Sequence, residues 1–338
     1  MIDYTDALIG AETEDELQVL PELTEVETKV WDRIRKRIEA REIGMSFSAI
    51  KQFSESPFHY VRYKVASELK QDKGTAAMVF GSLVDCLCFT PDEVDNQFAK
   101  EPAGGAMNSN KGCDVLLRFY GEMFQKELDS LPEKDRADEL SEMIGAIEQA
   151  LGPAKFDDKK QTIRAAKAIC TKRIITDVIL QQATAIRNRV YSNEASRRIM
   201  YQLTATQVEN EFEAFGWKWK GKFDGEGERL IADMKMMVSA KPEKAMRTIR
   251  DMHYDWQGAL YTLPRGGGKK FYNICLDRQL GVSVIHLDQR VLANAWGMVE
   301  EMVQHFERCI FEGMDDPSVW YSSYDFFAAR NGIYEYGR

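Results

Sequence analysis

Two aspartates and a lysine near the middle of the chain have the types and spacing needed to hydrolyse a phosphodiester bond. Asp233 follows Asp224 by nine residues, and Lys235 follows Asp233 by two. Carboxylate oxygens are the ligands that Mg²⁺ prefers, and bound Mg²⁺ polarises a phosphoryl group and helps to activate water. The lysine can position that water or offset the charge that develops on the phosphate. A D-x-K spacing alone is weak support, because a strand with one solvated face often produces it.

The residues around this trio predict two short strands that would bring it together. Large apolar and basic residues alternate over 217–224, which is the two-residue period of a strand. The two glycines in 225–228 predict a turn, and 229–237 predicts a second strand. Side chains two apart on a strand point to the same face, so Asp233 and Lys235 are expected on one side of the sheet.

A helix predicted over 241–263 carries two further sets of polar residues. Gln257 and Tyr261 are four residues apart and therefore share a helical face. Basic residues recur at three-residue steps on the same segment, namely Lys241, Lys244, Arg247 and Arg250. They are either an ordinary solvated face or contacts for a DNA backbone, and the sequence leaves both interpretations open.

The net charge of −9 is concentrated at the amino terminus. Residues 1–28 hold nine acidic residues and no basic one, which predicts an acidic flexible tail. The rest of the chain has 45 acidic and 45 basic residues, whereas 217–250 has nine basic and five acidic ones. The region of the candidate site is therefore locally basic, as contact with phosphates requires.

The periodicity elsewhere predicts an α/β fold, with a large helical half before a central mixed sheet flanked by helices. Helices are expected at 29–43, at 46–70 with a break at Ser56-Pro57, at 75–89 and through most of 113–200. Further strands are expected at 204–215, 271–276 and 282–287, and a closing helix at 289–312.

The length of 338 residues allows one large domain after the tail. We expect that domain to span 29–338. Its helical part would run to about residue 200, its α/β core over about 201–312 and its carboxy-terminal extension over 313–338.

The order of Asp224, Asp233 and Lys235, followed by Gln257 and Tyr261, resembles the core of the PD-(D/E)XK nucleases. The last two residues would be the Q-x-x-x-Y motif of the exonuclease branches of that superfamily. Phe223 stands where the family usually has a proline before the first acid.

Segments upstream are similar to the amino-terminal half of the exonuclease VIII catalytic domain and its phage relatives, distant cousins of phage lambda exonuclease. These segments are 45–60, 75–85 and 91–93, and with gaps the resemblance spans about 45–310. Asp85 stands where exonuclease VIII relatives usually have a histidine metal ligand, and the lambda relative is similar in using an acid there. The resemblance implies a metal site made by Asp85, Asp224, Asp233 and the backbone carbonyl of Met234.

The resemblance also implies an activity. The expected protein is a Mg²⁺-dependent DNA exonuclease, with Mn²⁺ able to substitute, that digests linear duplex DNA from 5′ to 3′. It would leave 3′ single-stranded overhangs for a single-strand annealing recombinase, and it would act as a ring-shaped homo-oligomer. The residues expected to contact DNA are Ser46, Ser48, Lys51, Lys222, Lys241, Lys244 and Arg247. Ser46, Ser48 and Lys51 can equally be a helix cap and a surface lysine.

Several other classes of protein do not fit the sequence. Six scattered cysteines without C-x-x-C spacing argue against zinc and a disulfide framework. Some of the nucleases that the chain resembles hold an iron–sulfur cluster with a carboxy-terminal group of cysteines, and because only Cys309 lies near that end, no cluster is expected. The segment 266–270 lacks the spacing of a nucleotide-binding loop, so ATP is not expected. Without a run of eighteen apolar residues or a signal peptide, the expected location is the cytoplasm of a bacterial cell, with a host, phage or prophage gene.

Two other functions stay open. One is a Cas4-like or helicase-associated nuclease, which has the same chemistry but lacks support from cysteine clusters or helicase motifs in this sequence. The other is a non-catalytic DNA-binding protein that has kept the nuclease fold. The complete set of Asp224, Asp233 and Lys235 argues against it.

Overall fold

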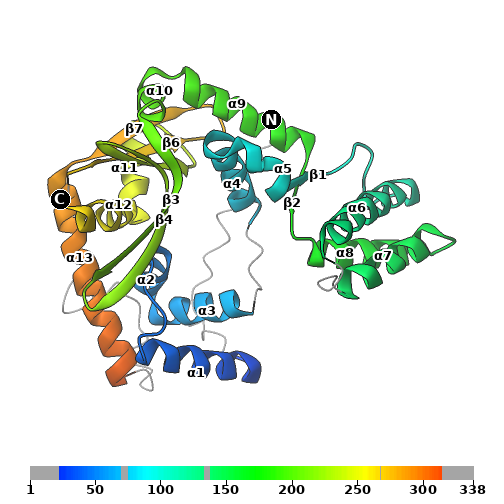
Figure 1. Cartoon of the computed structure of the whole chain (residues 1–338), viewed down its shortest axis with the longest axis horizontal. Helices are drawn as coiled ribbons and strands as arrows, with labels where there is room; N and C mark the ends of the chain where they lie inside the picture. Colours follow the sequence, from blue (N-terminus) through cyan, green and yellow to red (C-terminus); the bar gives the residue numbers. More distant parts are fainter. Residues whose placement is uncertain (1–22, 70–74, 133–137, 267, 314–338) are drawn as a thin grey trace, which may run out of the picture.

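The computed structural model describes residues 23–69, 75–132, 138–266 and 268–313, and it places a helical half ahead of a five-stranded sheet (Figure 1). This is the expected α/β architecture. The helices of the first half are α1 (Glu25–Glu39), α2 (Phe47–Glu55), α3 (Pro57–Glu68), α4 (Ala76–Phe89), α5 (Val94–Gln97), α6 (Asn110–Ser130), α7 (Asp138–Leu151), α8 (Phe156–Ile169), α9 (Asp177–Ser192) and α10 (Glu194–Met200). A short turn of 3-10 helix, η2 (Pro91–Glu93), precedes α5.

Short polar side chains start several of these helices where the sequence predicts it. The hydroxyl of Ser46 accepts from the N–H of Ala49 and caps α2. Ser56 caps α3 in the same way, with Pro57 in the first position of the helix. The side chain of Thr75 caps α4. Each cap satisfies an N–H group that the helix itself leaves without a partner.

The first described helix begins earlier than expected, at Glu25. Thr24 and Glu27 form a reciprocal capping box there, and Glu27 pairs with Arg62 of α3 at 3.3 Å. The expected tail is therefore wrong over 25–28, because the acids of that stretch complete a helix start. Residues 1–22 lie outside the described residues.

The sheet has the order β3-β4-β5-β6-β7, and every pair in it is antiparallel except β5 with β6. Its strands are β3 (Leu203–Ala214), β4 (Trp217–Gly227), β5 (Leu230–Met236), β6 (Lys270–Leu276) and β7 (Val282–Leu287). The parallel pair needs a crossover, which α11 (Pro242–Asp251), α12 (Tyr254–Thr262) and the turn η4 (Leu263–Arg265) provide. The closing helix α13 (Gln289–Arg308) runs into a wider turn, η5 (Cys309–Gly313).

The turn expected at 225–228 is wrong, because β4 continues to Gly227. Its glycines are there for close packing. A Cβ atom on Gly225 would lie 2.5 Å from the Leu203 side chain, and one on Gly227 would lie 2.2 Å from the carbonyl oxygen of Gln202. Backbone crowding therefore leaves no room for a side chain at Gly227, whereas at Gly225 the Leu203 side chain would have to move.

We predict that Gly227→Ala lowers the free energy of unfolding by about 1–3 kcal/mol, the usual cost of overpacking. Gly297→Ala is the matched control, because it lies in α13 with nothing within 4 Å of the new methyl group. That change should stabilise by about 0.5–1 kcal/mol. Urea titrations of both variants measure the difference, and an unchanged midpoint for Gly227→Ala would contradict the packing explanation.

The helix expected over 241–263 is two helices, α11 and α12. They are separated at His253, which adopts a left-handed backbone with φ of 55°. The ring of His253 stacks on Trp256 at 4.1 Å between centroids. The break directs α12 into the core, where Trp256 and Leu260 are buried, while the basic residues of α11 stay exposed.

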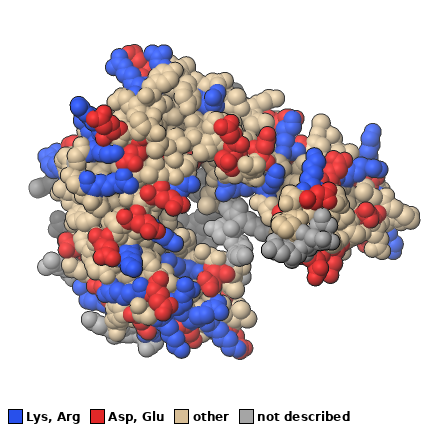
Figure 2. All heavy atoms as spheres, in the orientation of Figure 1, with Lys and Arg blue, Asp and Glu red and all other residues tan. Residues whose placement is uncertain are grey.

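Two hydrophobic clusters cover the opposite faces of the sheet. On one face, Ile231 and Phe271 pack against α12, α13 and the α1–α3 helices. On the other, Ala232 and Ile274 pack against α4, α9 and α10. Acidic and basic side chains are interspersed over the molecular face that Figure 2 shows. No helix among the described residues is long and apolar enough to cross a bilayer.

Helices α6, α7 and α8 share a third cluster of their own, built around Tyr120 and Phe124. Figure 1 shows them to one side of the sheet. The chain reaches them after β1 (Phe98–Lys100) and returns through β2 (Arg173–Ile175), and these strands form a parallel pair. Strand β2 lies within the stretch expected to be almost entirely helical.

Candidate active site

A cavity of about 250 Å³ lies where β4 and β5 separate. These strands pair only at Gly225 with Ala232 and at Glu226 with Ile231, so beyond that point side chains from both layers can enter between them. The cavity is lined by Gly81, Ser82, Val84, Asp85, Lys222, Asp224, Asp233, Met234, Lys235, Met236 and Gln257. All the expected metal-binding residues thus line one cavity, with Lys235, Lys222 and Gln257.

Asp224 bridges the two strands where their ladder ends. Its Oδ2 atom accepts a hydrogen bond from the backbone N–H of Met234 at 2.6 Å. Burial raises the pKa of Asp224 well above its usual value, and the carboxylates of Asp233 and Asp85 raise it further. A charged Asp224 is therefore unfavourable unless a cation lies near it.

Asp233 and Lys235 form an ion pair in the wall of the cavity. Lys235 Nζ lies 2.5 Å from Asp233 Oδ2, and Asp233 is 2% exposed. Burial alone would lower the pKa of Lys235, but the carboxylates of Asp233 and Asp224 raise it above its usual value. The lysine is therefore a cation and hydrogen-bond donor at neutral pH, and is not available as a base.

Asp85 projects from α4 on the opposite side of the cavity. Its Oδ2 atom accepts from Gln207 Nε2 at 3.0 Å, whereas its Oδ1 atom is buried without a hydrogen-bond partner among the described residues. Burial and then the charge of Asp233 raise the pKa of Asp85 to about 6. Buried carboxylate oxygens normally accept a hydrogen bond, so one without a donor is free to bind a metal ion.

The pKa of Asp85 makes stability depend on pH. Between about pH 4 and about pH 6 the folded protein keeps a proton that the unfolded chain has lost, so stability falls as the pH rises through this range. In EDTA, we expect the unfolding temperature to fall less between pH 5 and pH 7 for Asp85→Asn than for the wild type. Calorimetry at pH 5, 6 and 7 measures this, and equal slopes would contradict it.

Gln257 and Tyr261 lie on one face of α12, as expected, and they connect this helix to Asp233 and to the backbone of β4. Gln257 Nε2 is 3.4 Å from Asp233 Oδ1 and donates to Tyr261 Oη at 3.0 Å. The Tyr261 hydroxyl donates in turn to the carbonyl of Lys222 at 2.9 Å. The tyrosine ring fits only because Gly221 has no side chain, since a Cβ there would lie 2.7 Å from the ring.

The residues expected to contact DNA are less closely grouped. Lys222 lines the cavity, and Lys51 lies beside it, with its Nζ 5.6 Å from the centroid of the Tyr254 ring. Ser46 serves as the cap of α2, and Ser48 is exposed. The other three lie outside the cavity. Lys241 is the N-cap residue of α11, and the exposed face of that helix carries Lys244 and Arg247.

Besides Gly81, Ser82, Val84 and Met236 in the cavity wall, two residues that contact the expected site residues were not predicted. Gln207 holds Asp85 from β3, where it has a left-handed φ of 52°. Tyr254 places its ring 4.7 Å from Lys235 Nζ. Neither has a local signal, because each depends on a partner more than fifteen residues away in the sequence.

The residues of the cavity fit a hard cation. Three carboxylates and the backbone of Met234 supply oxygen ligands of the kind that Mg²⁺ takes. Among the described residues, however, no three acidic, histidine or cysteine side chains are gathered closely enough to form a finished site. Asp233 is paired with Lys235, and Asp85 is hydrogen-bonded to Gln207. The carboxylates would therefore have to shift towards one another to bind the same ion.

Comparison with known proteins places the whole cavity inside a recognised domain. The family model of a PDDEXK-like domain of unknown function (DUF3799) matches residues 46–318. A solved structure from Eubacterium rectale, described as a "putative exonuclease", is 19% identical to this chain and has a TM-score of 0.47, covering 87% of this chain and 88% of that one. No curated protein matches the chain significantly.

Proposed function

We propose that this chain, which belongs to the family of PDDEXK-like domains designated DUF3799, is a Mg²⁺-dependent deoxyribonuclease. The observation that carries the proposal is the meeting of Asp85, Asp224, Asp233 and Lys235 around one cavity, with the lysine paired to an acid. A fold alone does not specify an activity, but this set of groups has the chemistry for phosphodiester hydrolysis.

The proposed roles follow from the contacts of each residue. Asp85, Asp224, Asp233 and the carbonyl of Met234 would hold Mg²⁺, or Mn²⁺ in its place. The bound ion polarises the phosphate and lowers the pKa of water. Lys235 is charged and lies at the cavity wall, so it can donate to the attacking water or to a phosphate oxygen. Gln257 orients Asp233 through its amide nitrogen.

The finer proposal is an exonuclease that digests linear duplex DNA from 5′ to 3′ and prepares overhangs for a single-strand annealing recombinase. Its support is the resemblance of the motifs, in particular Gln257 and Tyr261 in the Q-x-x-x-Y arrangement. A ring-shaped homo-oligomer is proposed on the same ground. We propose the cytoplasm of a bacterial cell as its location.

A digestion series tests the activity and its polarity together. Linear duplex DNA labelled at either end is incubated with Mg²⁺, with Mn²⁺ and with EDTA, using 5′-phosphate and 5′-hydroxyl ends, and a closed circle serves as the control. We expect metal-dependent loss of the linear DNA alone. Cleavage of the circle would indicate an endonuclease, and binding of DNA with no cleavage in any metal would favour the non-catalytic protein.

A further inference from the structure

Lysines of α2 and α3 lie near lysines of the sheet at two places. Lys51 of α2 and Lys235 of β5 lie on the same ring, with their Nζ atoms 5.6 and 4.7 Å from the centroid of Tyr254. A second pair of lysines whose positive charges interact is formed by Lys64 of α3 and Lys220 of β4. Like charges that face each other lower stability unless an anion lies between them.

Lys64 has an environment that favours an anion. Its Nζ lies 5.5 Å from the Tyr60 ring, and none of the described carboxylates forms an ion pair with it. Burial, and then the positive charge of Lys220, lower the pKa of Lys64 to about 8. Such a lysine makes the folded chain less stable than an exposed lysine would, and a bound oxyanion would remove that penalty.

Lys220 belongs to a row of lysines that leads to the catalytic acids. Exposed and buried residues alternate along β4, so Lys218, Lys220 and Lys222 point to the solvent side of the strand ahead of Asp224. Lys220 is four residues from Asp224, about 13 Å along a strand. A phosphate held at Lys220 would therefore lie outside the reacting centre but on the same path.

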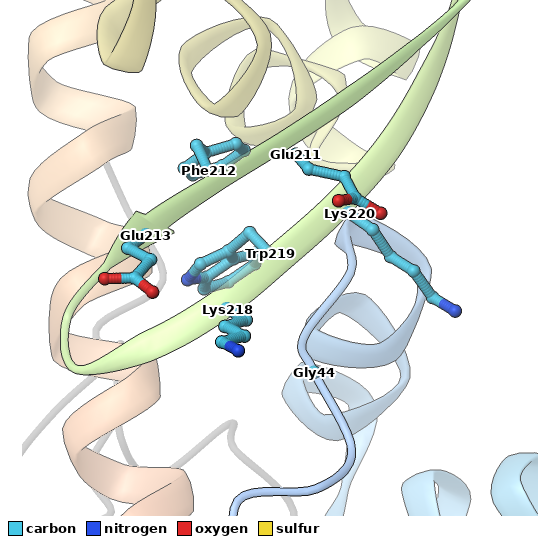
Figure 3. A pocket seen from close by; sticks show the side chains of 7 residues that line it. All are labelled: Gly44, Glu211, Phe212, Glu213, Lys218, Trp219 and Lys220. Atoms are coloured by element: carbon cyan, nitrogen blue, oxygen red, sulfur yellow. The ribbon is translucent and has the colours of Figure 1, made fainter.

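A second cavity, of about 410 Å³, opens beside this row. Figure 3 shows Lys218 and Lys220 on one strand of it, with Glu211 and Glu213 on the outer strand β3. Lys220 reaches past the carboxylate of Glu211 towards the helix that follows Gly44. The acids thus line the outer side of the lysine row, and an anionic chain would be confined to the inner side, next to the segment at Gly44 that leads into α2.

The backbone around this cavity is fixed to the start of α2. The N–H of Met45 donates to the carbonyl of Lys218 at 2.7 Å, and the N–H of Lys220 donates to the carbonyl of Met45 at 3.0 Å. Gly44 allows the approach, because a Cβ there would lie 2.7 Å from the Lys218 oxygen. Lys218 and Lys220 are therefore held at a fixed position relative to the α2–α3 helices.

We propose that Lys64, Lys218 and Lys220 form a second phosphate-binding position, and that its ligand is the sugar–phosphate backbone of the nucleic-acid strand entering the catalytic cavity. The proposal rests on the proposed nuclease function and specifies where that site holds its substrate outside the reacting bond. These lysines are positioning residues, since none of them lines the catalytic cavity.

A different role is open to two of the three lysines, and it makes a different prediction. Lys218 and Lys220 are the cross-strand partners of Glu213 and Glu211, so they could serve the β3–β4 hairpin alone. In that case neutralising them would lower stability slightly and leave nucleic-acid binding unchanged. Lys64 lies in helix α3 and takes no part in the β3–β4 hairpin. Weaker nucleic-acid binding after its replacement would therefore support the phosphate position and not the hairpin role.

The test measures binding of a labelled single-stranded 20-mer in EDTA over a series of salt concentrations. The variants are Lys64→Gln, Lys220→Gln and the pair together, with Lys64→Arg and Lys220→Arg as charge-preserving partners. Lys126→Gln, on α6, is the matched control for loss of one exposed charge. We expect each glutamine to weaken binding several-fold at low salt and to reduce the slope of log Kd against log salt by about 0.7, the value for one phosphate contact on a single strand.

Cleavage of a small phosphodiester separates this proposal from the nuclease function. Bis(p-nitrophenyl) phosphate has no extended backbone, so the lysine variants should hydrolyse it at the wild-type rate while their KM for DNA rises. If the wild type cleaves nothing but the lysine variants lose binding, the phosphate position stands and the nuclease function is wrong. If the wild type cleaves DNA and the glutamine variants bind like Lys126→Gln, the phosphate position is wrong. A wild type that does not bind the 20-mer overturns it as well.

Discussion

Asp224→Asn should remove nearly all DNA cleavage while leaving the metal-free protein folded and, at alkaline pH, more stable. The amide keeps an oxygen that can accept the N–H of Met234, so the link between β4 and β5 survives. The negative ligand for the metal is lost, and we expect the rate to fall on the order of 10³-fold, as when a major electrostatic group of an active site is removed. Single-turnover cleavage with Mg²⁺ measures the loss.

The stability change has a definite sign. Because the folded pKa of Asp224 is raised, the charged carboxylate destabilises the folded state at any pH above that pKa. Asparagine removes this effect, so the unfolding temperature in EDTA should rise at pH 8 and be nearly unchanged at pH 4, where the carboxyl group is protonated. Asp129→Asn, on an exposed position of α6, is the control for the loss of a charge. A variant that cleaves at near the wild-type rate would remove Asp224 from the site.

Lys235→Gln should lose most of the rate but keep metal binding. The lysine is held in its charged form by Asp233 and Asp224, so its replacement removes a donor from the cavity without removing an oxygen ligand. We expect kcat to fall by about 10²–10³-fold, with the affinity for Mn²⁺ retained or increased because a competing cation has gone. Titration calorimetry with Mn²⁺ and single-turnover cleavage measure the two effects separately.

An ion pair elsewhere in the chain, in which only the lysine is buried, provides the control. Lys159 has a side chain only 8% exposed and pairs with Asp114 at 2.6 Å in the α6–α8 region. Only the lysine of this pair is buried, because the Asp114 side chain is 37% exposed, so Lys159→Gln should destabilise the protein by about 1–3 kcal/mol yet leave the rate intact. Loss of metal binding in Lys235→Gln, or equal loss of rate in both variants, would contradict the proposed role.

Local patterns were sufficient for the parts of the site that sit on regular elements. The alternation before Asp224 gave the strand, and the four-residue spacing of Gln257 and Tyr261 gave their common face. Their meeting with Asp233 in the fold agrees with the order of the motifs. Whether these residues bind a metal or DNA stays a prediction.

The errors came from residues whose reason lies in a distant contact. Gly225 and Gly227 have the composition of a turn, but Gly227 lies against the backbone of Gln202 and Gly225 against the Leu203 side chain. The break at His253 is different, because it is a single left-handed residue within a stretch whose periodicity is helical on both sides. Gln207 meets Asp85 from 122 residues away, and no local period carries that information.

The separate core of α6, α7 and α8 has a consequence for how the protein opens. Their buried side chains pack on one another, and the connection to the sheet region includes the three-residue strands β1 and β2. Regions with their own core can unfold without the rest, with an opening free energy below that of the whole molecule. In hydrogen exchange, the amides around Tyr120 and Ile163 should therefore exchange as one cooperative unit while those of β5 and β6 stay protected. Heat or mild denaturant would release this unit first and leave the carboxylate cavity assembled.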